Sequence, residues 1–392
     1  MHDPLPLPLA MLIVFGSAKL LAELFARLGQ PSIVGEILAG ALVGPSVLGW
    51  ITPNETLKAL SELGVMFLLF GVGLEVKASE LLKVGGKATL VATIGVIVPF
   101  FAGWGILLAW GAPQIEAVFV GAAMVATSVG ITASVLSARG LLHEIASKII
   151  LAAAVIDDVL GLIVLAIVSS VARGKINLWE IALIAALATA FTVVMAVWGT
   201  TAVKRLLPIF GSRARADDAE FHIALVFMFM LALLAQYTGV AAIVGAFLAG
   251  LALSDSADAR VRTLTRGVSE LLVPFFLAGI GLRFNLDVFR SKSTVALALV
   301  ILIAAILTKL IGCGAGALSL GWQNVLKVGL GMVPRGEVGM VVAQIGLSMA
   351  VISSEVYSVV VFMAVATTLV APLLLKIAFR TPVLAPVEVK PC

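Results

Sequence analysis

Long apolar segments, separated by short polar breaks, follow one another along the chain. Most of them are long enough for one helix to cross the hydrocarbon core of a bilayer, which takes about 20 residues. The segments cover residues 5–28, 32–50, 57–76, 86–110, 115–138, 145–171, 178–206, 219–237, 239–254, 268–285, 293–320, 323–348 and 354–380. The pattern predicts an all-α polytopic membrane protein with about 13 transmembrane helices.

Composition supports this class. Hydrophobic residues make up 61% of the chain and charged residues 12%, whereas soluble domains carry about 25% charged residues. The two cysteines, Cys313 in an apolar segment and Cys392 at the end of the chain, predict neither a disulfide framework nor a zinc site. None of the three histidines lies deep within an apolar segment. We therefore expect no enzyme activity, no catalytic residues and no cofactor.

The distribution of lysine and arginine predicts the orientation. If the N-terminus lies outside, most of the 26 basic residues fall in loops on the cytoplasmic side, in agreement with the positive-inside rule. An odd number of helices then places the C-terminus in the cytoplasm. We expect a multi-pass protein of the cell inner (plasma) membrane that contacts membrane lipids and binds no nucleic acid.

The order of the segments predicts a repeat. Six helices (5–171), one linker helix (178–206) and six further helices (219–380) form a single unit over residues 1–392. Because one helix separates the two sets, the second set enters the membrane from the opposite side. This is the inverted-topology repeat of many secondary transporters. The halves share no obvious residue identity, so the repeat is inferred from topology.

The fifth helix of the first repeat carries signals of a break. Thr127, Ser128, Thr132 and Ser134 cluster around Gly130. An unwound stretch would free carbonyl and hydroxyl oxygens to coordinate a desolvated cation, and the ends of half-helices would add partial charges. Small polar residues are also common where membrane helices pack closely, so this string alone leaves both interpretations open.

The fifth helix of the second repeat has a stronger break signal. Residues 329–339 place Pro334, Arg335 and Glu337 among glycines in the middle of an apolar segment. Two charges and a proline at this depth cost too much to serve packing alone. Arg335 and Glu337 could form an ion pair near the break.

Two adjacent acids lie within an otherwise apolar helix. Asp157 and Asp158 are about 100° apart around the helix axis, so only one of them can face a given partner. Lys309, deep in another apolar segment, is the obvious partner for one acid. The three groups together carry a charge of −1, which suits one monovalent cation, and groups this close titrate together. A site that binds either protons or a cation points to an antiporter. The alternative is an ion-pair network that only fixes helix packing.

Six strings spread over the chain complete the picture. They are Gln30–Gly40, Val43–Gly49, Ala126–Thr132, Ala154–Leu162, Val244–Phe247 and Pro334–Gly339. With these strings the chain resembles bacterial monovalent cation:proton antiporters of the cation:proton antiporter-2 family, and is similar to the NapA-type sodium/proton antiporters. The resemblance implies thirteen helices whose fifth and twelfth members cross at their breaks.

The resemblance also implies roles for individual residues. Asp158 would be the ion-binding carboxylate, Asp157 the partner of Lys309, and Thr127 and Ser128 would help to coordinate the ion. Na⁺ or Li⁺ would be held by Asp158, Asp157 and Thr127. Thr132, Arg335 and Glu337 would support the site near the helix breaks.

A division into two parts follows from the same resemblance. An ion-carrying bundle (approximately 57–171 and 268–380) would move like an elevator against a dimerisation part (approximately 5–50 and 178–254), and the protein would form a homodimer. Paired aspartates are associated with electrogenic exchange in the family. We therefore expect an electrogenic sodium(lithium)/proton antiporter, with Na⁺, Li⁺ and H⁺ as substrates. A potassium/proton exchanger or an electroneutral exchanger is the alternative. A channel or a sodium-coupled symporter finds less support, because neither a filter motif nor an organic-substrate pocket is evident.

Overall fold

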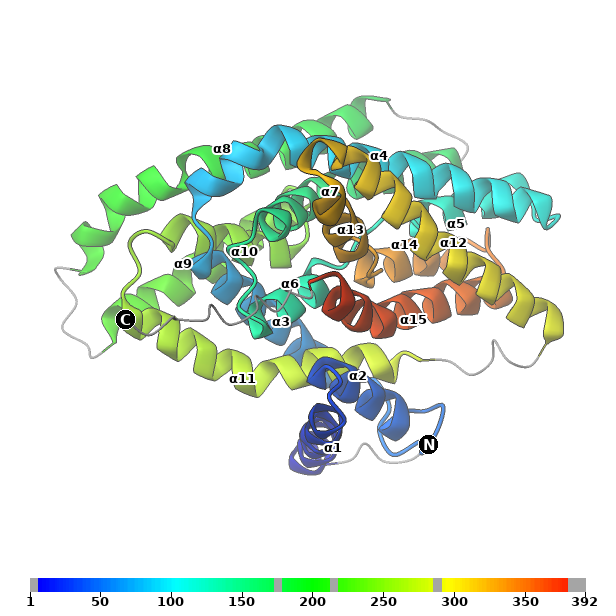
Figure 1. The fold of residues 1–392 in the computed structure, drawn as a ribbon, viewed down its shortest axis with the longest axis horizontal. Helices are drawn as coiled ribbons and strands as arrows, with labels where there is room; N and C mark the ends of the chain where they lie inside the picture. The colour runs from blue at the N-terminus through cyan, green and yellow to red at the C-terminus, as the bar shows by residue number, and fades with distance from the viewer. Residues whose placement is uncertain (1–5, 173–177, 212–217, 285–290, 380–392) are drawn as a thin grey trace, which may run out of the picture.

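The computed structural model describes residues 6–172, 178–211, 218–284 and 291–379, and these form an all-helical fold (Figure 1). The α-helices are α1 (Leu7–Arg27), α2 (Ser32–Val43), α3 (Glu55–Glu75), α4 (Ala78–Ala109), α5 (Gln114–Ala123), α6 (Val129–Ala138), α7 (Ile145–Ala172), α8 (Leu178–Gly211), α9 (Ala219–Tyr237), α10 (Ala242–Leu253), α11 (Ala259–Leu282), α12 (Lys292–Gly316), α13 (Trp322–Gly331), α14 (Glu337–Ser348) and α15 (Ser354–Ala378). A short 3₁₀ turn, Leu318–Leu320, joins α12 to α13.

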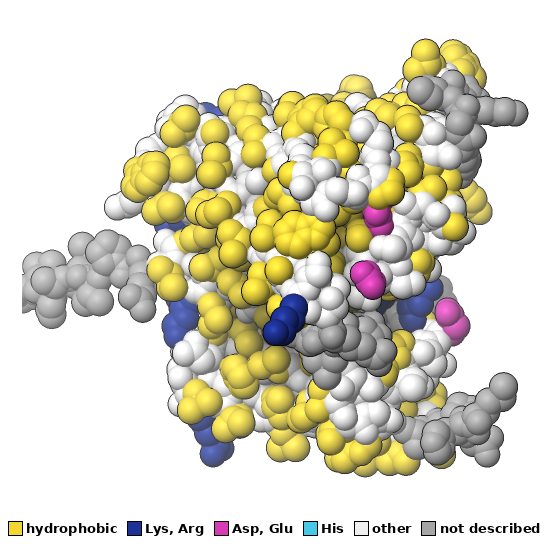
Figure 2. Space-filling model, turned by 90° about the vertical axis from the view of Figure 1, so that its right-hand side faces the viewer, with side chains coloured by type: hydrophobic (Ala, Val, Ile, Leu, Met, Phe, Trp, Pro, Cys, Tyr) yellow, Lys and Arg dark blue, Asp and Glu magenta, His cyan; other side chains and the backbone are white. Residues whose placement is uncertain are grey.

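Nine of the helices described are long and apolar enough to cross a membrane. The six remaining α-helices are shorter. They include two pairs, α5 with α6 and α13 with α14, and each pair fills one predicted spanning segment. The thirteen predicted segments therefore correspond to fifteen helices, with the fifth and twelfth segments broken. One side of the molecule is largely covered by hydrophobic side chains, with few and scattered charges (Figure 2), as expected for a surface that faces lipid.

The three predicted helix boundaries that differ most from the structure each do so for a physical reason. The helix α4 begins at Ala78 rather than 86, and α11 begins at Ala259 rather than 268. Both helices start with polar turns that an apolar pattern does not capture, and the Asp258 side chain caps α11 by accepting from the Val261 N–H at 2.7 Å. The helix α2 ends at Val43 rather than 50, because Gly44 precedes a proline and takes an extended conformation.

The repeats do share residues, contrary to our expectation. Residues 33–40 in α2 and 243–250 in α10 both read Ile-Val-Gly-X-X-Leu-Ala-Gly. Residues 61–74 in α3 and 269–282 in α11 both read Ser-Glu-Leu-X-Val-X-Phe-X-Leu-X-Gly-X-Gly-Leu. The repeat can therefore be recognised from the sequences of these four helices.

The shared glycines make matching contacts in the two repeats. A Cβ atom on Gly40 would overlap the backbone carbonyl of Ala278, and in the other repeat a Cβ atom on Gly250 would overlap that of Phe70. Gly281 approaches the Ile37 carbonyl as Gly73 approaches the Phe247 carbonyl. Glycine at these positions lets α2 lie directly on α11, and α10 directly on α3.

Two groups of helices can be distinguished by their packing. The helices α3 and α11 pack mainly against α10, α2 and each other, whereas α4 packs mainly against α12, α7 and α5. In Figure 1, α11 runs beside α1 and α2 along one edge, while α8 follows the opposite edge close to α4. The predicted division placed α3 and α11 with the ion-carrying bundle, and it stays a prediction. The glycines of α3 and α11 make backbone contacts with α10 and α2.

Candidate ion-binding site

The two helix breaks meet in the middle of the molecule. The Ser128 N–H, in the link between α5 and α6, donates to the Pro334 carbonyl at 2.8 Å. The Thr132 hydroxyl donates to the Gly331 carbonyl at 2.7 Å. A Cβ atom on Gly336 would lie 2.7 Å from that of Ser128, so the two links touch at a point where a side chain has no room. The predicted crossing of the fifth and twelfth segments is present.

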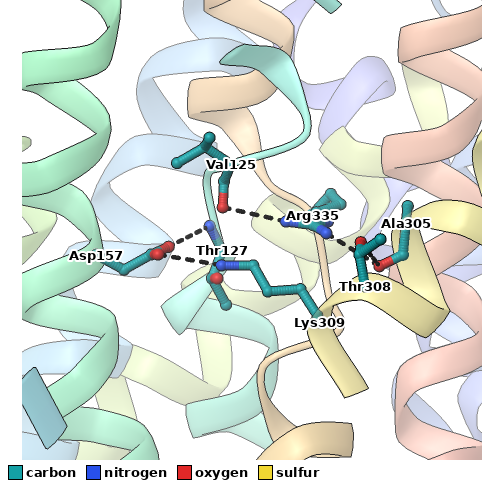
Figure 3. Close-up of polar contacts among 7 residues, drawn as sticks. All are labelled: Val125, Thr127, Asp157, Ala305, Thr308, Lys309 and Arg335. Atoms are coloured by element: carbon teal, nitrogen blue, oxygen red, sulfur yellow. Dashed lines mark hydrogen bonds and ion pairs between the residues drawn. The ribbon is translucent and has the colours of Figure 1, made fainter. Parts of the chain in front are cut away.

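An ion pair between the repeats lies beside this crossing (Figure 3). Lys309 Nζ, on α12, lies 3.0 Å from Asp157 Oδ1, on α7. The other carboxylate oxygen, Oδ2, accepts from the Thr127 N–H at 2.9 Å. Both charged side chains have 0% exposure. Asp157 therefore ties Lys309 to the unwound link that follows α5.

Asp158 and Thr127 bring further oxygen atoms to the same region. Asp158 occupies the next position of α7, about 100° around the axis from Asp157, and is 9% exposed. The Thr127 hydroxyl oxygen is buried and has no hydrogen-bond partner among the residues that the structure describes. A buried hydroxyl without a partner is uncommon and costly. Thr127 thus contributes its amide to Asp157 and keeps an oxygen available for another ligand.

The side-chain partners of Arg335 that the structure describes are backbone carbonyl groups. Its guanidinium donates to the Val125 carbonyl at 3.1 Å and to the Ala305 carbonyl at 3.0 Å, as Figure 3 shows. The residue is 1% exposed. Val125 is the second residue after α5, so its carbonyl has no partner within that helix. Arg335 therefore links the first break to α12. The Glu337 side chain lies outside the described part of the chain.

Two residues that we did not predict hold Arg335 in place. The Thr367 hydroxyl oxygen accepts from the Arg335 N–H at 3.1 Å, and the Thr368 hydroxyl donates to the Arg335 carbonyl at 3.0 Å. Both threonines lie on α15 and are buried. Adjacent threonines within an apolar helix were a usable signal, but only the structure shows that they face the second break.

The structure thus gathers Asp157, Lys309, Thr127 and Arg335 into one region, with Asp158 next to Asp157 on α7. Ser128 and Thr132 hold the two breaks against each other through their bonds to backbone carbonyls. In chemical terms the region offers buried carboxylate, hydroxyl and carbonyl oxygens. These are the ligands that a hard cation such as Na⁺ or Li⁺ prefers.

Comparison with known proteins identifies the family. A profile described as "Sodium/hydrogen exchanger, transmembrane" matches residues 11–381. The chain belongs to the sodium/hydrogen exchanger family. It is accordingly a multi-pass membrane cation/proton antiporter and not an enzyme.

Sequence relatives of this exchanger extend over almost its whole length. It is 35% identical over 375 residues to the Na⁺/H⁺-K⁺ antiporter GerN of Bacillus cereus, covering 94% of this chain and 95% of that protein. It is 32% identical over 420 residues to the high-affinity Na⁺/H⁺ antiporter NhaS3 of Synechocystis sp., covering 95% and 89%.

A solved structure with the same fold is that of the sodium proton antiporter MjNhaP1 from Methanocaldococcus jannaschii. The TM-score is 0.74 at 17% sequence identity, and the match covers 95% of this chain and 96% of that one. At this identity the likeness concerns the fold of the exchanger alone.

Proposed function

We propose that this exchanger is an electrogenic sodium(lithium)/proton antiporter that works by alternating access. The observation that carries the proposal is the fully buried ion pair between Asp157 and Lys309, next to a second buried acid, at the crossing of two broken helices. A buried ion pair contributes little net stability. The buried ion pair is instead explained if its groups exchange protons for a cation.

The charges allow a balanced exchange. In the proton-loaded form, Asp158 is neutral and Asp157 pairs with the Lys309 ammonium. When Na⁺ binds, Asp158 and Lys309 each release a proton, and Na⁺ takes the place of the ammonium beside Asp157. The charge of the three groups plus their cargo is then 0 with protons and −1 with sodium. Each cycle would move one net charge across the membrane.

Thr127 and Arg335 complete the proposed site in different ways. The free Thr127 oxygen is a candidate ligand for the cation, together with Asp158 and Asp157. Arg335 acts as a fixed counter-charge, because its guanidinium is bound to backbone carbonyls on two elements and keeps its proton at any physiological pH. Lys309 is therefore the cation that takes part in exchange.

The helix packing supports a revised division into a moving and a stationary part. In this proposal α4–α7 and α12–α15 carry the site, while α1–α3 and α8–α11 form the scaffold, in which glycine contacts hold α2 on α11 and α10 on α3. The homodimer and the orientation with an outer N-terminus stay predictions from the resemblance and from the charge bias.

A potassium/proton exchanger is the second candidate, because the relative GerN is named as an antiporter of both Na⁺ and K⁺. The test is proton flux in proteoliposomes with sodium, lithium and potassium added separately, with the membrane potential either free or clamped. Flux that requires sodium or lithium and responds to the clamp supports the proposal. Flux with potassium alone, or flux indifferent to the potential, contradicts it.

A further inference from the structure

An apolar groove opens between the helices of the proposed carrier and those of the scaffold. It has a volume of about 240 Å³ and is lined by α4 and α7 on one side and by α8 and α10 on the other. Leu82 on α4 and Val193 on α8, at its two lips, are 49% and 48% exposed. The groove is therefore open to the surface that faces lipid. The linker helix α8 has no counterpart in the repeat, so this groove has no symmetric mate.

The groove offers no free hydrogen-bond donor to an occupant. Its two polar side chains are threonines, and both donate to their own helix: Thr89 to the Gly85 carbonyl at 2.9 Å, and Thr192 to the Ala188 carbonyl at 2.9 Å. The remaining lining residues are apolar or glycine. The lining therefore suits a hydrocarbon occupant.

The dimensions fit a chain rather than a compact molecule. The lining of α4 runs from Ala78 to Thr89, about 16 Å of helix, and half of the hydrocarbon core of a bilayer is about 15 Å thick. Midway along it, no neighbouring group lies within 4 Å of the place where a Cβ atom on Gly85 would be. Space is thus open beside α4 in the middle of the groove.

We propose that this groove binds one acyl chain of a membrane phospholipid. The chain would enter from the leaflet next to the N-terminus of α4, where Lys77 is exposed directly before Ala78. Its end would reach Ile156, the residue before Asp157 on α7. Because the groove has walls from both proposed parts of the antiporter, the bound lipid would touch the boundary across which they move.

The test uses photo-cross-linking in nanodiscs of the whole protein. The probe is a phosphatidylglycerol with a diazirine midway along one acyl chain, and the linked peptides are mapped by mass spectrometry. We expect peptides with residues 81–89 and 192–196 to be labelled several-fold more than the lipid-facing surface of α12 around Ile303 and Ile311, which are 55% and 62% exposed. Equal labelling of the groove and of α12 would mean ordinary surrounding lipid and would overturn the proposal.

A pair of neighbouring glycines supplies a matched control. A Cβ atom added to either Gly85 or Gly86 would meet open space, but only Gly85 lines the groove. Gly85→Leu should lower the groove labelling at least fivefold, and Gly86→Leu should leave it unchanged. If Gly85→Leu does not fold, Ala196→Leu fills the groove from α8. Labelling of the groove that persists in a folded groove-filling variant would contradict the proposal. This outcome does not depend on whether the protein transports sodium.

Discussion

The two repeats are alike in their scaffold helices and different at the site. The helix pair α2–α11 and its mate α10–α3 keep the same sequence strings and the same glycine-to-carbonyl contacts. At the site, the first repeat supplies both acids, Asp157 and Asp158, and the second supplies both cations, Lys309 and Arg335. Backbone packing can be satisfied twice by one sequence, whereas an ion pair needs unlike partners. The chemistry has therefore diverged where the packing has not.

The largest expected effect comes from substitution of Asp158, which belongs to the first repeat. Asp158→Asn should abolish cation-dependent proton flux, because the amide can neither bind a proton nor carry the charge that balances a cation. The measurement is flux in proteoliposomes alongside thermal unfolding. The matched control is Glu36→Gln, which changes another buried acid of the same repeat that pairs with Lys19 at 3.0 Å, away from the site. Wild-type flux in Asp158→Asn would remove Asp158 from the proposed mechanism.

Removal of the second repeat's partner should cost stability as well as activity. Lys309→Ala leaves the buried Asp157 without its counter-charge, and the loss of one partner of a buried ion pair costs about 3–5 kcal/mol. We expect a lower unfolding temperature and a shifted pH profile of transport. The double variant Asp157→Asn, Lys309→Ala should recover part of the stability, since it leaves no unpaired charge. If Lys309→Ala is as stable as the wild type and has an unchanged pH profile of transport, Lys309 has no part in the proposed exchange.

The shared scaffold contacts predict matched effects in the two repeats. Gly40→Ala and Gly250→Ala should each lower the free energy of unfolding by about 1–3 kcal/mol, because the added methyl group forces the helices apart. Denaturation of the purified variants in detergent measures this. Gly16→Ala, where a Cβ atom meets nothing within 4 Å, is the control and should not destabilise. Strongly unequal costs at Gly40 and Gly250 would show that the two contacts are not equivalent.

The smallest effect concerns a difference between the repeats within the scaffold. Glu36 in α2 corresponds to Ala246 in α10. Glu36→Ala gives the first repeat the residue of the second and removes an ion pair whose lysine is 45% exposed. The Glu36 side chain is only 8% exposed, but its removal leaves no buried charge, because Lys19 can reach solvent. We therefore expect a cost of about 0–1 kcal/mol. The free energy of unfolding should fall by no more than about 1 kcal/mol, and flux should stay within twofold of wild type. A loss of flux would assign Glu36 a part in transport.

Much of this organisation was predictable from the sequence. The thirteen segments follow from hydropathy, and both breaks follow from small polar residues, proline and charges in the middle of apolar stretches. The contact between Asp157 and Lys309 was predicted because few other partners exist at that depth, and the structure contains it. The roles of these residues in transport stay predictions.

Other features could not be read from residue types. The described partners of the Arg335 guanidinium are the backbone carbonyls of Val125 and Ala305. Because every residue carries a carbonyl, residue types do not predict such partners. The shared strings of the scaffold helices were overlooked, although they stand in the sequence. They consist of small and apolar residues that are common in any membrane helix, and their meaning emerges only from the matching contacts.

The ion pair between the repeats has a consequence for biosynthesis. Lys309 follows Asp157 by 152 residues, and a ribosome adds about 5–20 residues per second. For roughly 8–30 s, α7, which bears both acids, exists before Lys309, the partner of Asp157, has been synthesised. During that interval the acids must be protonated or sheltered by the insertion machinery. A nascent chain stalled before Lys309 should therefore be a better target for membrane quality control than the finished protein.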